Sequence, residues 1–195
     1  MNHYLFYLVL IKKVRKPQNI FQLKQAVDLY DFYTEKMIEC DQAMEKHYQS
    51  LPTQIDPDEK PMPPEKKNSH IKNKPHFDLR TQLYRIAGVD LTQIPGLNVL
   101  TVQTILTETG ADMSRFPTEK NMASWLCLSP GLKKSGGKIL NSKSRKTHNR
   151  ANLAFRQAAQ SLHHSKSALG AYYRRMQMRL GPPKAITATA HKLAR

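Results

Sequence analysis

The chain has 195 residues, 39% of them hydrophobic, and carries 31 Lys and Arg against 15 Asp and Glu. This length allows one or two domains. The net charge of +16 arises entirely at one end, since residues 120–195 hold 16 Lys and Arg and no Asp or Glu. Such a segment favours nucleic acid as a partner. It excludes a two-metal nuclease centre built from its own residues, because Mg²⁺ prefers carboxylate oxygens, and leaves Ser or Tyr as candidate nucleophiles.

The first residues do not predict a membrane segment. The apolar run 4–11 is too short to span a bilayer, and the positive charges follow it, which argues against a signal peptide. Cys40 and Cys127 lack metal-ligand spacing and are typical of reduced thiols. We therefore expect a cytoplasmic, nucleoid-associated protein with no membrane partner.

Residues 18–48 predict one long amphipathic helix. Apolar residues recur at steps of three and four, namely Ile20, Leu23, Val27, Tyr30, Tyr33, Met37, Cys40, Met44 and Tyr48. The stripe is narrow and needs a partner helix, so the 18–48 helix is predicted either to pack on its own domain or to join a homo-oligomer as a coiled coil.

Six prolines between Pro52 and Pro75, mixed with charged residues, predict an extended linker. The expected organisation is a stub and coiled-coil helix over 1–50, a Pro-rich linker over 51–76, and a helical DNA-binding domain over 77–195.

That domain is predicted to begin with a helix over 78–87. The turn 94–97 then leads into a second helix that ends at Gly110, which resembles a helix-hairpin-helix. Gly96 would let the backbone approach a DNA phosphate, and Asn98 would take left-handed geometry in place of a second glycine. An ordinary helix–turn–helix core element is the alternative.

Further helices are predicted along the basic segment. Thr118 would cap a helix with Met122, Trp125 and Leu126 inward, ended by Pro130-Gly131. A helix after Asn149 has a small-residue face, and two more cover about 167–180 and 184–195, the last with Ile186, Ala190 and Leu193 on one face. The chain stops without a C-cap, so we expect a C-terminally truncated domain.

Between these helices lies a basic segment with Ser135 beside two glycines. The glycines remove side-chain bulk where a phosphodiester would approach, and the cations would neutralise a phosphoryl transition state. Ser135 is the candidate nucleophile, forming a phosphoserine ester; a flexible phosphate-binding turn is the alternative. The candidate DNA-binding residues, with Gly96, are Lys133, Lys134, Gly136, Gly137, Lys138, Lys143, Arg145, Lys146 and Arg150.

Several runs in order resemble the C-terminal domain of the DEDD-type insertion-sequence transposases, the bridge-RNA-guided recombinases. They are DLTQIPG (90–96), RFP (115–117), ASWL (123–126), SPG (129–131), SGGK (135–138), RKT (145–147), NR (149–150), AAQSL (158–162), LGAYYRR (169–175) and AITATAHKLA (185–194). The resemblance covers about 78–195, and the helix and Pro-rich stretch before it resemble the family's coiled-coil insert.

The resemblance implies a transposase whose serine, here Ser135, forms the covalent link to DNA, with a guide RNA as a further partner. In this family an N-terminal RuvC-like domain binds Mg²⁺ through its DEDD carboxylates. No such domain precedes the helix here, so Mg²⁺ is expected only with that missing domain and no cofactor is expected in this chain.

We therefore expect a mainly α-helical protein acting in DNA transposition or site-specific recombination. A catalytically inactive DNA- or RNA-binding remnant is the alternative. A tyrosine recombinase is a third hypothesis, which would use Tyr172 or Tyr173 with His148, Arg150 and Arg174.

Overall fold

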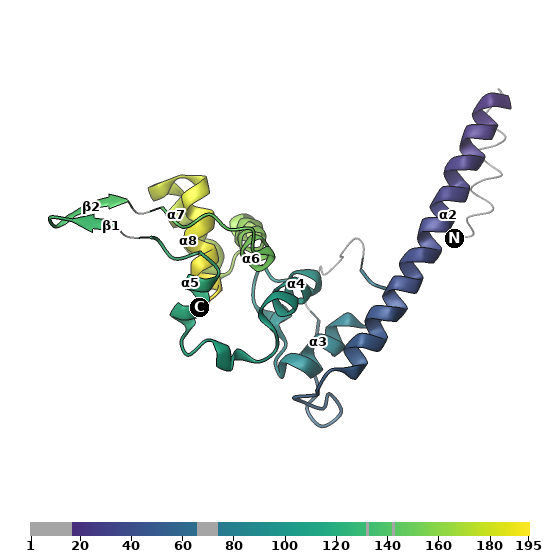
Figure 1. The fold of residues 1–195 in the computed structure, drawn as a ribbon, viewed down its shortest axis with the longest axis horizontal. Helices are drawn as coiled ribbons and strands as arrows, with labels where there is room; N and C mark the ends of the chain where they lie inside the picture. Colours follow the sequence, from purple (N-terminus) through teal and green to yellow (C-terminus); the bar gives the residue numbers. More distant parts are fainter. Residues whose placement is uncertain (1–16, 66–73, 132, 142) are drawn as a thin grey trace. The chain divides into compact units, whose positions relative to one another are not determined.

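The computed structural model of the protein describes residues 17–65, 74–131, 133–141 and 143–195 (Figure 1). The chain forms two compact units. The arm unit consists of the residues up to Ser50 together with Pro75–Phe77, and the basic unit consists of Leu51–Lys74 together with Asp78–Arg195. Both are mainly helical, which confirms the predicted fold class. The apolar run 4–11 lies outside the described residues.

The arm unit is built on one helix, α2 (Pro17–Ser50), which confirms the helix predicted over 18–48. Near its C-terminal end, His76 donates its backbone N–H to Asp41 Oδ2 at 3.0 Å, and the ring of Phe77 lies 6.2 Å from that of Tyr48. Farther along α2, several large apolar side chains are at least half exposed: Phe21, Leu29, Tyr30, Phe32, Tyr33 and Met37. The oligomeric role of this helix remains a prediction.

The described part of the Pro-rich stretch belongs to the basic unit and packs on its first helix, α3 (Leu79–Ala87). The backbone N–H groups of Gln54 and Ile55 both donate to Arg85 O, at 2.9 and 3.3 Å, and Tyr84 Oη donates to Lys60 O at 3.1 Å. The last carbonyls of a helix lack intrahelical partners, so an irregular segment can bind them. The predicted linker over 51–76 therefore differs from the structure, because residues 51–65 form a strap on the helix α3.

The described residues of the basic unit form six further α-helices. They are α3 (Leu79–Ala87), α4 (Val99–Thr109), α5 (Glu119–Trp125), α6 (Arg150–Ser161), α7 (Ala168–Leu180) and α8 (Pro182–Leu193). Short 3-10 turns, η1 (Leu91–Gln93), η2 (Met113–Arg115) and η3 (Leu162–His164), lie between them. Five helices begin with a side chain that accepts from a first-turn N–H: Asp78, Asn98, Thr118, Asn149 and Ser167. These caps satisfy N–H groups that a helix leaves unpaired.

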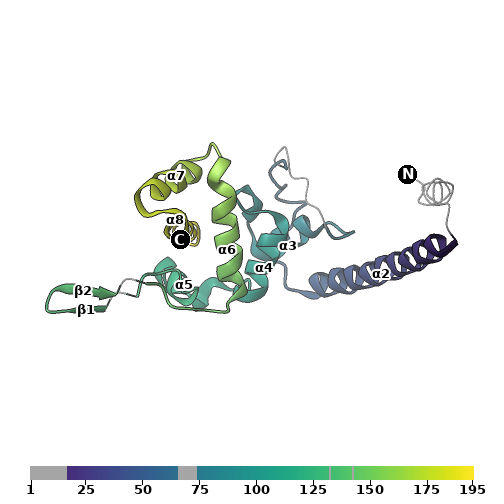
Figure 2. The same ribbon diagram turned by 90° about the horizontal axis from the view of Figure 1, so that it is seen from above.

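Helix α6 is the centre of this unit and packs against both α4 and α8 (Figure 2). Its inner face is the predicted small-residue stripe, now seen to be buried: Ala151, Ala154, Phe155, Ala158, Ala159 and Leu162. The alanines let the neighbouring helices approach closely, which leaves no room for larger side chains. At its start, Asn152 Nδ2 donates to Leu126 O at 2.6 Å, a buried bond that ties α6 to the end of α5.

A buried ion pair joins α3 to η1. Arg80 Nη2 lies 2.5 Å from Asp90 Oδ2, and the same nitrogen donates to Pro63 O in the strap at 2.7 Å. Asp90 also accepts from Thr92 and Gln93. One carboxylate thus fixes the turn that follows α3 and, through Arg80, holds the strap.

Two local expectations are wrong. Helix α5 ends at Trp125, well before Pro130-Gly131, because Cys127 takes a left-handed φ of 55° and turns the chain. Trp125 is 39% exposed and packs its ring 5.5 Å from that of Phe116. In α8 the inward residues are Ala185, Thr189 and Ala190, whereas Ile186 is only partly buried.

We predict that Asp90→Asn lowers the free energy of unfolding by about 2 kcal/mol at neutral pH, because Arg80 then keeps a buried charge without its partner. Burial raises the pKa of Asp90, but hydrogen bonds from Arg80, Thr92 and Gln93 outweigh it and hold the pKa below the ordinary 3.8. A carboxyl with a lowered pKa stabilises the fold above its ordinary pKa and loses this effect as the pH falls through the folded value.

The difference between wild type and Asp90→Asn should therefore be constant near neutrality and shrink below pH 3.8. Urea unfolding at several pH values measures it. The matched control is Asp58→Asn, at an exposed position, which should change stability little at any pH. A difference that does not depend on pH would contradict the ionic account.

Candidate nucleic-acid interface

The predicted serine loop is a β-hairpin. Strand β1 (Lys133–Ser135) pairs antiparallel with β2 (Lys138–Asn141), and Ser135 lies opposite Lys138. Gly136 and Gly137 form the turn with φ of 54° and 74°. A two-residue hairpin turn with both φ values positive is type I′, which strongly prefers glycine. The glycines are thus required by the turn itself, and the sequence analysis missed the two strands.

The tip of the hairpin is open to solvent. Ser135, both glycines and Lys138 are exposed, and a Cβ added at Gly136 or Gly137 would meet no atom within 4 Å. Figures 1 and 2 both show β1 and β2 extending away from the helices of the basic unit. A DNA backbone can therefore reach the Ser135 hydroxyl without moving any helix.

The base of the hairpin is fastened to the helices. Gly131 N donates to Lys143 O at 3.1 Å, and Pro130 forms a β-bridge with Ser144. Arg145 Nη2 then donates to Ser124 O in α5 at 2.9 Å. The guanidinium of Arg145, predicted to contact DNA, has a structural partner in this conformation.

The structure separates the predicted site residues into a tip group and a base group. The tip carries Ser135, Gly136, Gly137 and Lys138, and the base carries Lys143, Arg145, Lys146 and Arg150. The strand β2 begins at Lys138 and ends at Asn141, so it separates the two groups. Lys133 and Lys134 belong to β1, and their side chains lie outside the described part.

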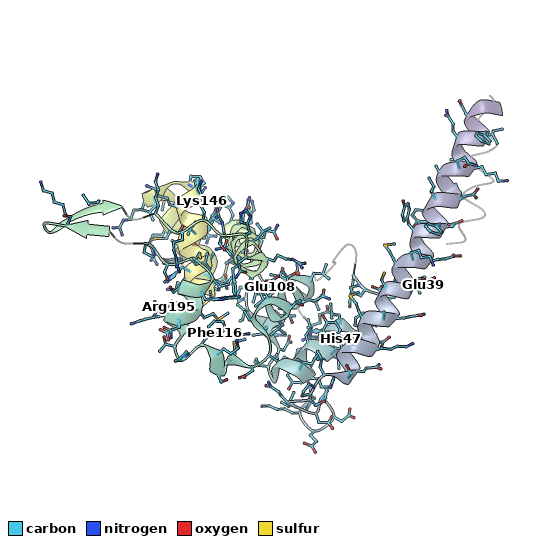
Figure 3. The ribbon with its side chains drawn as sticks, viewed as in Figure 1. Glu39, His47, Glu108, Phe116, Lys146 and Arg195 are labelled. Carbon is cyan, nitrogen blue, oxygen red and sulfur yellow. The ribbon has the colours of Figure 1, made fainter. Side chains whose placement is uncertain are left out.

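Two residues of the base group stand beside the start of α6. Lys146 is exposed, and Figure 3 shows it among the helices, apart from the hairpin tip. The Arg150 side chain is 74% exposed, with its Nε 3.8 Å from Glu108 Oε1. At that distance and exposure the Glu108 contact is weak, so Arg150 can exchange it for a phosphate.

A cavity of about 450 Å³ opens along α6 beside this base group. Its lining, which we call the α6 cavity, consists of residues 147–150, Asn152, Leu153, Arg156, Gln157, Gln160 and Ile186. Arg156, Gln157 and Gln160 were not among the predicted site residues. Their spacing could have identified them, because all three lie on the face of α6 opposite the alanines.

Gly96 lies elsewhere in the unit, against the end of α6. Its φ is 92°, and an added Cβ would stand 2.8 Å from Ala158 O and 3.1 Å from the Leu162 side chain. Asn98, expected in left-handed geometry, is extended, and its side chain caps α4 by accepting from Thr101 N. The packing against α6 is a structural reason for the glycine, beside its predicted role at a DNA phosphate.

The tyrosine-recombinase arrangement is not assembled. Tyr173 is buried at 3% exposure, and Arg174 Nη1 donates to His163 O and Ser165 O. Lys192 Nζ lies 4.6 Å from the ring centre of Tyr172, with Arg175 on the same ring at 5.8 Å. These side chains stabilise helix ends and each other.

Among the described residues, neither a cluster of metal ligands nor a membrane-spanning helix is found. Within them no three His, Cys, Asp or Glu side chains gather as metal ligands would. No described helix is both long and apolar enough to cross a bilayer.

Part of the chain matches a known protein family. Residues 88–174 match the family model described as Transposase IS116/IS110/IS902 family. The matched segment runs from the end of α3 into α7, and it includes Gly96, the hairpin and every residue of the α6 cavity lining except Ile186. Residues 88–174 are thus similar to a transposase domain of insertion sequences. No curated protein and no solved structure matches the chain.

The first prediction for this interface concerns salt. Lys138→Ala at the tip and Lys146→Ala at the base should each reduce the slope of log affinity for DNA against log salt by about 0.9, because each removes one phosphate contact. Fluorescence anisotropy of a labelled duplex at several salt concentrations measures the slope. Lys24→Ala, an exposed change in α2, is the control. An equal change in that control would contradict the assignment.

The second prediction separates two glycines. Gly96→Ala should lower the free energy of unfolding by about 3 kcal/mol, because it combines a positive φ with a clash against α6. Gly137→Ala, with a φ of 74° but open space around it, should lower it by about 1 kcal/mol. Denaturant titration measures both. Similar values for the two variants would show that packing against α6 does not require Gly96.

Proposed function

We propose that this protein acts in DNA transposition or site-specific recombination and that Ser135 is its nucleophile. The observation that carries the proposal is the position of Ser135, exposed beside a tight Gly-Gly turn in a carboxylate-free segment. The match of residues 88–174 to a transposase family supports the reaction class. Lys138 opposite Ser135 adds a cation at the same end of the hairpin.

The proposed step is an exchange of one ester for another. Ser135 Oγ attacks the phosphorus of a DNA phosphodiester, the Oγ–P bond forms, and the P–O3′ bond breaks. The serine proton passes to a base and the leaving 3′ oxygen takes up a proton, so the balance is neutral. The product is a 5′-phosphoserine link with a free 3′-hydroxyl, and the reverse step reseals a strand without an external energy source.

Electrostatics support such a step at the tip. Charge builds up on the phosphoryl oxygens in the transition state, and nearby cations stabilise it. Lys138 is exposed beside Ser135, and the sequence places Lys133 and Lys134 just before it. We further propose that any Mg²⁺ the reaction needs is held by a DEDD domain, in line with the family resemblance.

Assembly belongs to the same proposal. The half-exposed apolar residues of α2 would join copies of the chain, and DNA would bind along the base group and tip. A guide RNA is a further proposed partner, which rests on the family resemblance alone. An inactive DNA- or RNA-binding remnant is the second candidate, because the exposed cations Lys138 and Lys146 can bind phosphate without any nucleophile.

Trapping of the covalent adduct tests the nucleophile. With a DEDD domain and a DNA target supplied, wild type should form a protein–DNA adduct that maps to Ser135 by peptide mass, and Ser135→Ala should form none. The matched control is Ser144→Ala at the hairpin base, which should keep the adduct. An adduct in Ser135→Ala, or one at Tyr172, would sink the assignment. Salt-sensitive binding without any adduct would favour the remnant.

A further inference from the structure

The α6 cavity is not used by the proposed serine chemistry. It lies along the exposed face of α6, on the far side of the hairpin base from Ser135, and it holds about 450 Å³. This volume falls in the range of small-ligand sites and is too small for a duplex.

Two kinds of side chain meet in the cavity. Leu153 is 56% exposed although it belongs to a helix whose other face is fully buried, and Ile186 of α8 lines the same cavity. Gln157 and Gln160 add two carboxamides one turn apart on α6. Apolar side chains beside carboxamides suit a flat heterocycle, because apolar groups can cover its faces and amides can bond to its edge.

The positive charges of the cavity lining suit a phosphate. Arg150 and Arg156 are both exposed and line the cavity. The lining contains no Asp or Glu, and the whole segment 120–195 has none. A recess lined by two apolar side chains, two carboxamides and two arginines can hold one nucleotide, with the apolar and amide groups on its base and the arginines on its phosphate.

We infer that the α6 cavity binds a single unpaired nucleotide of a DNA strand, held by Leu153, Ile186, Gln157 and Gln160. Strand exchange exposes unpaired nucleotides at the cut, so such a site would hold a displaced end while Ser135 holds the other. The inference rests on the proposed DNA-binding function, but it does not require Ser135 to be the nucleophile.

The test uses the full chain and two labelled DNAs, a blunt duplex and the same duplex with a short single-stranded DNA overhang. The overhang should bind about tenfold more tightly, the size expected for seating one base. Leu153→Ala and Gln157→Ala should each reduce this preference several-fold and leave the affinity for the blunt duplex unchanged. Both side chains are exposed, so the variants should fold, which circular dichroism checks.

The matched control is Gln177→Ala on α7, outside the cavity, which should keep the full preference. Equal affinity for the two DNAs, or an unchanged preference in Gln157→Ala, would overturn the inference and leave the proposed function standing. Tight binding of a ribonucleotide overhang with none of the deoxyribonucleotide overhang would also overturn it. Failure to bind either DNA would overturn the proposed DNA binding and the inference together.

Discussion

Close packing on the alanine face of α6 is the constraint on which the basic unit depends. Ala151, Ala154, Ala158 and Ala159 are buried, and α4 and α8 pack against this helix. The turn before α4 approaches so closely that only glycine fits at position 96, where an added Cβ would meet Ala158 O at 2.8 Å. Close-packed interiors transmit any increase in volume, so these small residues fix the position of α6 relative to its neighbours.

The position of α6 in turn fixes the segment that leads out of the hairpin. Asn149 caps α6, Asn152 donates to Leu126 O, and Arg145 donates to Ser124 O. These hydrogen bonds tie the segment that follows the hairpin to the end of α5. Among the described residues, the hairpin tip is held by its own strand pairing and turn. The proposed nucleophile on this tip is accessible and would have to be oriented by the partners that bind it.

The positive charges of this unit serve two purposes. Arg80, Arg85, Arg145 and Arg174 donate to backbone carbonyls of the strap, the helix ends and the turns. The guanidinium group presents several donors in a fixed plane, which suits such sites. Exposed lysines such as Lys138 and Lys146 remain available as mobile charges for phosphate. The net charge therefore overstates the number of cations that DNA can contact.

The sequence by itself determined the helices and the separation of charge. The 3.6-residue pattern and the cap residues located α6 and α7 almost to the residue, because caps and burial act over one or two turns. The confinement of the charge to 120–195 needed only counting. Ser135 and its glycines were visible as a motif, and so were the basic residues around them.

Only the tertiary structure decided how these parts are used. In the structure, the segment around Ser135 is a hairpin whose tip lies apart from Arg145 and Lys146, and Gly96 packs against α6. It placed the strap on α3 through carbonyls that no pattern marks. It also joined Ile186 to the outer face of α6 in one cavity. These features depend on contacts between residues far apart in the chain, and local periodicity carries no information about which distant surfaces meet.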